Sequence, residues 1–274
     1  MINEFKRLIK GGWFFAGIIF TLALCFFSNI IMGEENYTII QVLQNMSREE
    51  MMQEIQLYPS VVVRNAFSGY VTLFIPVVAA LPFVQMYHAE VQSGYKRFFI
   101  SRKSCFRYYR DKWFAGMLVS GFMLLAVAAL FHAFILFTLP MPDLSEFEYL
   151  DFGKENMVVS FLKIYTGIFF YGIFSTIPAI LVSVFTTDFY FLICIPFIFT
   201  YFWDICISGL ASVFVNDPNG LLLNLVEQFY SKAYLWMAES WKDFLIAGGK
   251  VILILLVLFA VYHLVLKKKF DSGI

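Results

Sequence analysis

Apolar residues gather in six long stretches separated by polar segments, and this pattern predicts the elements of the chain. About 20 helical residues are needed to cross a hydrocarbon core of about 30 Å. Six stretches reach that length, at residues 11–32, 66–87, 113–139, 157–185, 189–215 and 248–266. Four prolines lie inside them, and neighbouring helices can bond the carbonyls that a proline leaves free. The pattern therefore predicts an all-α fold, a polytopic membrane protein with six transmembrane helices in a single domain over residues 1–274.

Two polar segments are predicted to be more than loops. The segment NEFKRLIK at residues 3–10 places Phe5, Leu8 and Ile9 on one helical face and its cations largely on another. This predicts an N-terminal amphipathic helix in the inner membrane interface; a plain basic flank of the first span is the alternative. Residues 216–247 begin with an Asp-Pro-Asn-Gly turn and continue with helical apolar spacing. We expect a re-entrant helical hairpin there, on the extracellular side before the sixth span.

Lys and Arg gather before the first span, between the second and third spans, and after the sixth span. These three places hold 13 of the 20 basic residues, and six spans put them all on one side of the membrane. Short cytoplasmic segments of membrane proteins carry an excess of Lys and Arg. We therefore expect cytoplasmic N- and C-termini, a cytoplasmic loop at 88–112, and extracellular loops at 33–65, 140–156 and 216–247, the first two of which are acidic.

Composition excludes a water-soluble fold. The chain has 274 residues, of which 60% are hydrophobic and only 15% are charged, whereas a globular domain has about 25% charged residues.

The four cysteines have no metal-ligand spacing, and the string AGGK lacks the spacing of a phosphate-binding loop. We expect a protein that is not an enzyme and that holds no metal or cofactor of its own.

One carboxylate lies deep within a predicted span. Asp204, in FTYFWDICISG of the fifth span, is costly at bilayer depth unless it is paired or hydrated. Contact with a transported substrate is one interpretation, which makes Asp204 a candidate residue of a substrate path. A structural hydrogen bond to a neighbouring backbone or tyrosine, or a position nearer the interface, is the other.

The most basic part of the chain is the run SGYKRFFISRKSCFRYYRDKW at residues 93–113, in which seven cations alternate with aromatic residues. In a soluble protein this pattern would suggest a nucleic-acid surface. Here the run is only a short loop between two spans, so we expect no binding to nucleic acid. Orientation of the protein and binding to anionic lipid explain part of the charge, at about 1 kcal/mol per basic residue near the membrane surface.

The same run, read from QMYHAEVQSG onward, contains Glu90, then Ser-Gly at 93–94, a short amphipathic stretch, Arg102, and Lys112 just before the third span. This order resembles the cytoplasmic loop of type-2 bacterial ABC transporter permeases of the exporter kind. The sequence departs from that pattern at Tyr95, where threonine is common, and in SRKSCFR, which lacks the usual proline. The predicted spans, cytoplasmic termini, N-terminal helix and re-entrant hairpin also resemble that family.

The resemblance implies that this segment is a coupling helix, which docks on a separate ATPase subunit. The implied contact residues are Glu90, Gly94, Arg97, Phe98, Phe99, Arg102 and Lys103. A coupling helix needs an apolar ridge to bury and charges around its rim, and the two phenylalanines with their flanking cations are compatible with this.

The function implied is that of the permease subunit of an ATP-driven exporter in the bacterial plasma membrane. Two permease copies, identical or homologous, would form the path, and two ATPase subunits would bind ATP and Mg²⁺. The aromatic and aliphatic spans favour a hydrophobic or amphipathic cargo, such as an antimicrobial or toxin peptide or a drug. A membrane-embedded peptide-binding or immunity protein without transport, or an ATP-independent carrier, are the alternatives.

Overall fold

The computed structural model describes residues 2–32, 35–67, 71–102, 105–141, 157–215, 222–223, 226, 229 and 241–271. Within these ranges the fold is helical apart from one small hairpin. In chain order the elements are α1 (Ile2–Lys10), α2 (Gly12–Phe26), β1 (Asn29–Met32), β2 (Glu35–Thr38), α3 (Ile39–Asn45), α4 (Arg48–Gln53), the 3-10 helix η1 (Ile55–Leu57), α5 (Pro59–Ala66), α6 (Val71–Gln92), α7 (Tyr95–Arg102), α8 (Cys105–Thr138), α9 (Met157–Val182), α10 (Phe189–Val213) and α13 (Trp241–Asp271).

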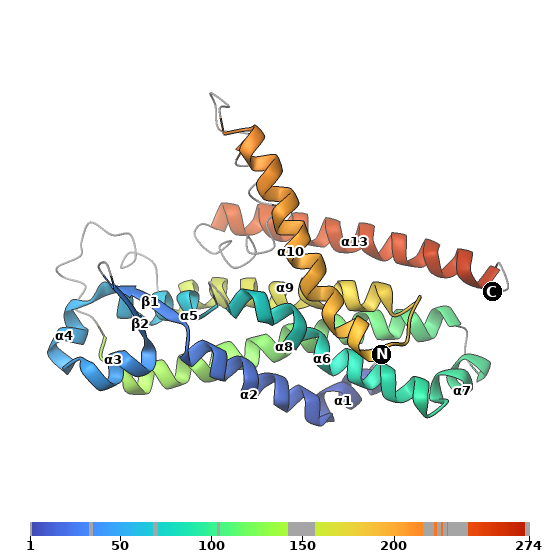
Figure 1. Ribbon diagram of the computed structural model, residues 1–274, viewed down its shortest axis with the longest axis horizontal. Helices are drawn as coiled ribbons and strands as arrows, with labels where there is room; N and C mark the ends of the chain where they lie inside the picture. The colour runs from blue at the N-terminus through green and yellow to red at the C-terminus, as the bar shows by residue number, and fades with distance from the viewer. Residues whose placement is uncertain are drawn as a thin grey trace.

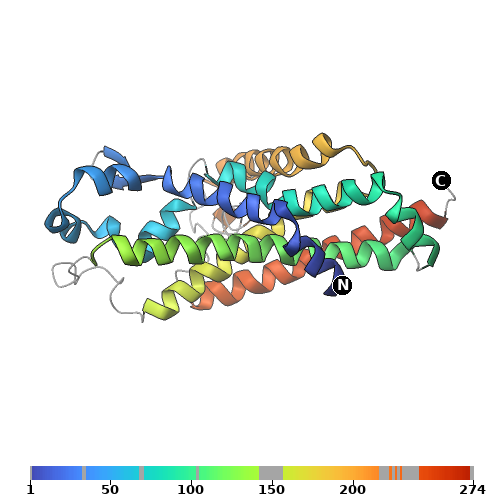
Figure 2. The ribbon, with the colours of Figure 1, turned by 90° about the horizontal axis from the view of Figure 1, so that it is seen from below.

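Long helices form an elongated bundle. Helices α2, α6, α8 and α9 lie side by side (Figures 1 and 2), and α10 packs on α6 and α9 while rising steeply away from the others. Five described helices are long and apolar enough to cross a membrane, and α1 with α2 meets the same test only as a pair bent by 58°. The predicted class, a helical polytopic membrane protein, is confirmed at this level, with five or six candidate spans.

The first predicted span is shorter than its apolar stretch. Helix α2 has 15 residues, which at 1.5 Å per residue gives about 22 Å, and it ends at Phe26 rather than near residue 32. The chain then enters a hairpin in which Asn29 pairs with Thr38. Ile30 and Met32 of β1 are buried, so the apolar spacing changes from the helical period to the alternation of a strand. Hydropathy does not distinguish these two periods within one short apolar run.

The segment predicted as the first extracellular loop is folded into short helices. Thr38 and Ser47 each begin a helix with a capping box, α3 and α4 respectively. Hydrogen bonds from the Ser47 backbone amide and hydroxyl group hold the pKa of the Glu50 carboxyl below its usual range. Val42 and Leu57 are fully buried and join the same apolar core as α2 and α8. This segment is therefore a cap on one end of the bundle. The hairpin predicted for 216–247 lies mostly outside the described residues.

Prolines in α6 leave carbonyls that other helices bond. Pro76 has no N–H to donate to the Thr72 carbonyl four residues earlier, and the Tyr171 hydroxyl of α9 donates to that oxygen at 2.9 Å. The Ala79 carbonyl, three residues before Pro82, accepts from the hydroxyls of Ser120 and Thr176 at 2.7 and 3.2 Å. These bonds join α6 to α8 and α9 at mid-bundle.

Glycines bring α8 and α9 into backbone contact. A Cβ atom at Gly172 would lie 2.8 Å from the Ser120 carbonyl oxygen and 3.0 Å from the Gly121 Cα. Small residues allow membrane helices to pack this closely, because van der Waals contact replaces the hydrophobic effect there. A side chain at this position must therefore push two core helices apart.

We expect Gly172→Ala to destabilise the protein by about 1–3 kcal/mol through overpacking. Gly209→Ala is the matched control, since nothing lies within 4 Å of a Cβ at that helical glycine and alanine favours helix by about 0.5–1 kcal/mol. The thermal midpoints of the two purified variants in detergent test this. Equal thermal midpoints of the Gly172→Ala and Gly209→Ala variants would contradict the close packing of α8 on α9.

Candidate functional site

The predicted cytoplasmic loop is almost entirely helical. Helix α6 runs to Gln92, α7 follows after Ser93 and Gly94, and α8 begins at Cys105. Gly94 has φ +73°, a left-handed conformation that glycine adopts without steric penalty. We call residues 88–112 the elbow, because the chain reverses there between two candidate spans (Figure 1).

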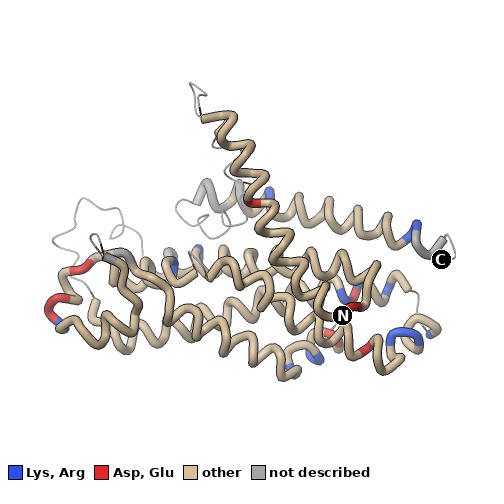
Figure 3. Tube along the Cα trace, in the orientation of Figure 1, with Lys and Arg blue, Asp and Glu red and all other residues tan. Residues whose placement is uncertain are grey.

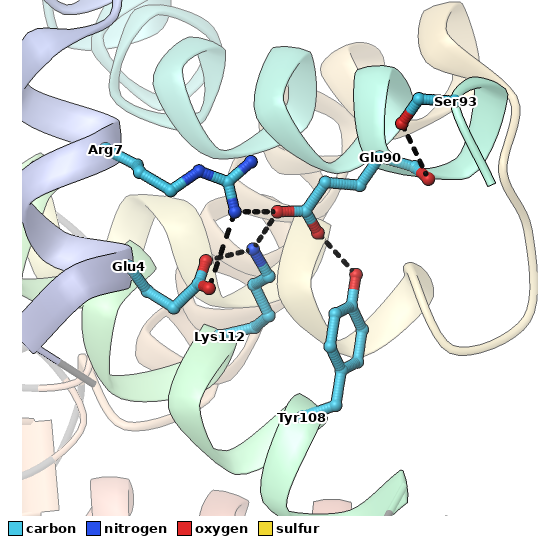
Figure 4. Close-up of polar contacts among 6 residues, drawn as sticks. All are labelled: Glu4, Arg7, Glu90, Ser93, Tyr108 and Lys112. Atoms are coloured by element: carbon cyan, nitrogen blue, oxygen red, sulfur yellow. Dashed lines mark hydrogen bonds and ion pairs between the residues drawn. The ribbon is translucent and has the colours of Figure 1, made fainter. Parts of the chain in front are cut away.

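At the elbow, four charged side chains meet in a cluster, of which Glu4, Glu90 and Lys112 are buried and Arg7 is partly exposed. Lys112 Nζ on α8 donates to Glu4 Oε2 at 2.5 Å and to Glu90 Oε1 at 2.6 Å. Arg7 on α1 donates to the same Glu90 oxygen at 2.9 Å, and the Tyr108 hydroxyl donates to the other at 2.7 Å. Figure 4 shows the Lys112 ammonium between the two carboxylates, which come from α1 and α6. We call Glu4, Arg7, Glu90 and Lys112 the ion cluster.

The ion cluster is balanced in charge, with two carboxylates against two cations. Glu90 and Lys112 are each 1% exposed, so neither charge can be stabilised by bulk water. Removing one partner of such a buried pair typically costs about 3–5 kcal/mol, because an uncompensated charge is left behind. The positions of α1, α6 and α8 therefore depend on one another at this point.

The structure separates the predicted coupling residues into two groups. Phe98 is 51% exposed, and the Arg102 guanidinium lies 4.1 Å from the centre of its ring. Arg97 is also exposed. Phe99 faces the protein instead, with its ring 5.4 Å from that of Tyr108, because one helical residue turns the chain by about 100°. The outward ridge of α7 thus contains one phenylalanine and not two.

Glu90 lies in the ion cluster and is buried within this chain. The family resemblance implied a contact with the ATPase subunit, which stays a prediction. Lys112, singled out only by its position before the third span, is the partner of Glu90 across 22 positions. Lys103 lies outside the described residues.

Two members of the ion cluster were missed by sequence reasoning. Glu4 lies one helical turn before Leu8, and both are buried on the inner face of α1. An acidic residue in register with the apolar face of a basic helix is the sign that could have revealed it. Arg7, assigned to the polar face, reaches both Glu4 and Glu90 and lies over the Tyr95 ring at 4.9 Å.

Asp204 lies at a second site. It is half-buried on α10 and directly follows Trp203. A cavity of about 210 Å³ lies between α9, α10 and α13, lined by Tyr171 and Trp203 among others. Across the described ranges, no three His, Cys, Asp or Glu side chains are grouped as metal ligands would be.

Charged residues outside the cluster are unevenly distributed. In Figure 3 most described Lys and Arg residues lie in the half of the molecule that contains α7, and the exposed acidic residues of α4 lie at the opposite end. Fold and site together define a helical polytopic membrane protein with an ion-paired elbow. Comparison of the chain with known protein families, with curated proteins and with solved structures gave no match.

We expect Lys112→Met to destabilise the protein by about 3–5 kcal/mol, because Glu4 and Glu90 then share the single cation of Arg7. The double variant Glu90→Gln with Lys112→Met should recover much of this loss, since one carboxylate again faces one cation. Thermal unfolding of the purified variants, monitored by size-exclusion chromatography, gives the stability loss of the single variant and of the double variant. A double variant less stable than Lys112→Met would show that charge balance does not hold the cluster together.

Proposed function

We propose that this chain is the permease subunit of an ATP-driven ABC exporter, and that α7 is the helix on which a separate ATPase subunit acts. One observation carries the proposal. A short helix projects Phe98 between the exposed cations Arg97 and Arg102, while the helices on both sides of it are fixed by the ion cluster.

This arrangement suits the transmission of force. An exposed aromatic side chain fills a partner's pocket, and the cations around it set register and speed encounter. Motion of α7 passes directly into α6 and α8, the two candidate spans that flank it. It also reaches α1, through the ion cluster and through Arg7 stacked over Tyr95 of α7.

Lipid binding alone would require cations near the membrane surface, but it would not require α7 to be fixed to α1, α6 and α8. Surface charge attracts anionic lipid wherever it is held, so lipid binding by itself does not account for a rigid connection between α7 and the two candidate spans beside it. A segment that must move as one body with two spans needs a connection such as the buried pairing of Glu90 with Lys112.

The remaining parts of the proposal follow from this role. The elbow and both termini face the cytoplasm of a bacterial cell, and α1 lies in the inner membrane interface. Two permease subunits, identical or homologous, form the path, and the ATPase pair holds ATP and Mg²⁺. The cargo is hydrophobic or amphipathic, such as an antimicrobial or toxin peptide or a drug.

One observation favours a second candidate, a membrane-embedded binding or immunity protein that does not transport. The cavity between α9, α10 and α13 is complete within a single chain. Such a protein needs no ATPase, so purification of the intact complex separates the two candidates.

Phe98→Ala and Arg102→Glu should each reduce the amount of ATPase subunit that co-purifies with the chain from native membranes by about 10-fold or more, as loss of an interface anchor does. Phe137→Ala is the control. Phe137 is also an exposed phenylalanine, at 90%, but it lies at the end of α8 that is far from the elbow. If the wild-type chain brings down no ATPase with nucleotide-binding motifs, the exporter proposal fails. Full retention by both elbow variants would instead overturn only the docking role of α7.

Gly94 offers a test of geometry. Its φ of +73° is strained for a β-branched residue and tolerated by asparagine, and a Cβ there meets nothing within 4 Å. Gly94→Val should therefore redirect α7 and abolish cargo-stimulated ATP hydrolysis by the complex, with membrane insertion preserved. Gly94→Asn should retain most of that stimulation. Equal stimulation in the two variants would show that the left-handed turn does not position α7.

A further inference from the structure

The cavity between α9, α10 and α13 lies near the middle of three candidate spans. Tyr171, Thr200 and Leu258 line it, and each is near the midpoint of its apolar segment, at Phe161–Val182, Phe189–Val213 and Gly248–Lys268. A ligand reaches this depth from the membrane or along a path through the protein, so it must tolerate an apolar environment.

Aromatic rings form most of the wall. They come from Tyr171, Phe174, Phe199, Trp203 and Phe229. The rings of Phe199 and Trp203 are nearly parallel, with an interplanar angle of 16° and centroids 6.1 Å apart. Aromatic side chains prefer offset-stacked or edge-to-face partners, so walls of this kind favour a flat ring over a flexible acyl chain.

The size of the cavity limits the ligand. An apolar cavity of about 150 Å³ holds benzene, and this one has a volume of about 210 Å³. It therefore accommodates about two fused rings. Phe199 and Trp203 are partly exposed, so the α10 side leaves room for a substituent to extend outward.

Every polar hydrogen on the described wall is already donated to a backbone carbonyl. The hydroxyls of Ser175 and Thr200 donate to the carbonyls four residues before them, each at 2.7 Å. Tyr171 donates to Thr72 as described above, and Trp203 Nε1 donates to the Phe229 carbonyl at 2.8 Å. The hydroxyl oxygens keep acceptor lone pairs. Among the described wall residues an anion would find no free side-chain donor, whereas an N–H or O–H group of a ligand would find acceptors.

The nearby charges do not reverse this preference. Asp204 follows Trp203 in sequence, and its charge is opposite to that of Lys250. Lys250 lies one helical turn before Ile254 of the wall, and both Asp204 and Lys250 have interactions of their own. Recognition rests on the rings and the acceptors.

We propose that this cavity is a binding site for a planar aromatic molecule of about two fused rings, neutral or cationic, that carries a hydrogen-bond donor. All of the described wall residues come from one chain, so the inference stands whether or not the protein transports. Binding is therefore measured on the isolated chain, without ATPase subunit or nucleotide.

The probes are 1-naphthylamine and 1-naphthalenesulfonate, which share one ring system and differ in a neutral donor against an anion. Each is titrated into the chain in lipid nanodiscs, and the signal of empty nanodiscs is subtracted. We expect one saturable site for the amine and at least about 10-fold weaker binding of the sulfonate.

Phe199→Ala should weaken amine binding by about 3- to 10-fold, the range expected for loss of one aromatic pair. Phe202→Ala is the matched control, since Phe202 lies on the same helix, is exposed, and is not part of the wall. Ile254→Trp should abolish saturable binding by filling the cavity. Thermal midpoints confirm that each variant is folded.

Three results would overturn the proposal. The first is an amine signal equal to that of empty nanodiscs, in which case lipid chains occupy the cavity. The second is equal affinity of the chain for the amine and the sulfonate. The third is equal affinity of the Phe199→Ala and Phe202→Ala variants for the amine. None of them bears on docking of α7, which is measured on the complex.

Discussion

The ammonium group of Lys112, held between Glu4 and Glu90, is the interaction on which the rest of this arrangement depends. It is nearly closed to solvent and joins helices that are far apart in sequence. Buried charges of this kind are stable only as a complete set. The ion cluster therefore fixes the positions of the N-terminal helix, the end of α6 and the start of α8 relative to one another. None of these three segments can move alone without breaking a buried ion pair.

The bundle around this joint has a well-packed half and a more open half. Helices α2, α6, α8 and α9 pack closely, through glycine contacts between α8 and α9 and through hydroxyl bonds to carbonyls of α6 near its prolines. Helices α10 and α13 bury far less of their surface within the chain. The cavity lies where these two halves meet, so a change in the position of α10 or α13 would alter it.

Particular residues show how far sequence reasoning reached. The apolar segments, the N-terminal helix and the basic elbow were all predicted near their observed places, because hydropathy and charge are local properties read against a bilayer. The short length of α2 was not predicted. Asn29–Met32 pairs with residues beyond a turn, and a hydropathy window has no information on strand pairing. Asp204 was singled out from the sequence as a candidate of a substrate path, which stays a prediction. The cavity lined by its neighbour Trp203 could not be seen in the sequence, because the described wall draws on three separate helices and Phe229.

The sequence alone indicated the class, a helical polytopic membrane protein, located five of the apolar helices that are long enough to cross a bilayer, and showed where the basic residues gather. The tertiary structure decided which of the unusual residues act together. Glu90, singled out by the family resemblance for a contact with the ATPase subunit, pairs inside the protein with residues 83 and 22 positions away. Phe98 and Phe99 were expected as one ridge, but only Phe98 is exposed, because Phe99 turns toward Tyr108 of the next helix. Both outcomes follow from contacts between helices, and no local pattern of residues specifies which helices will meet.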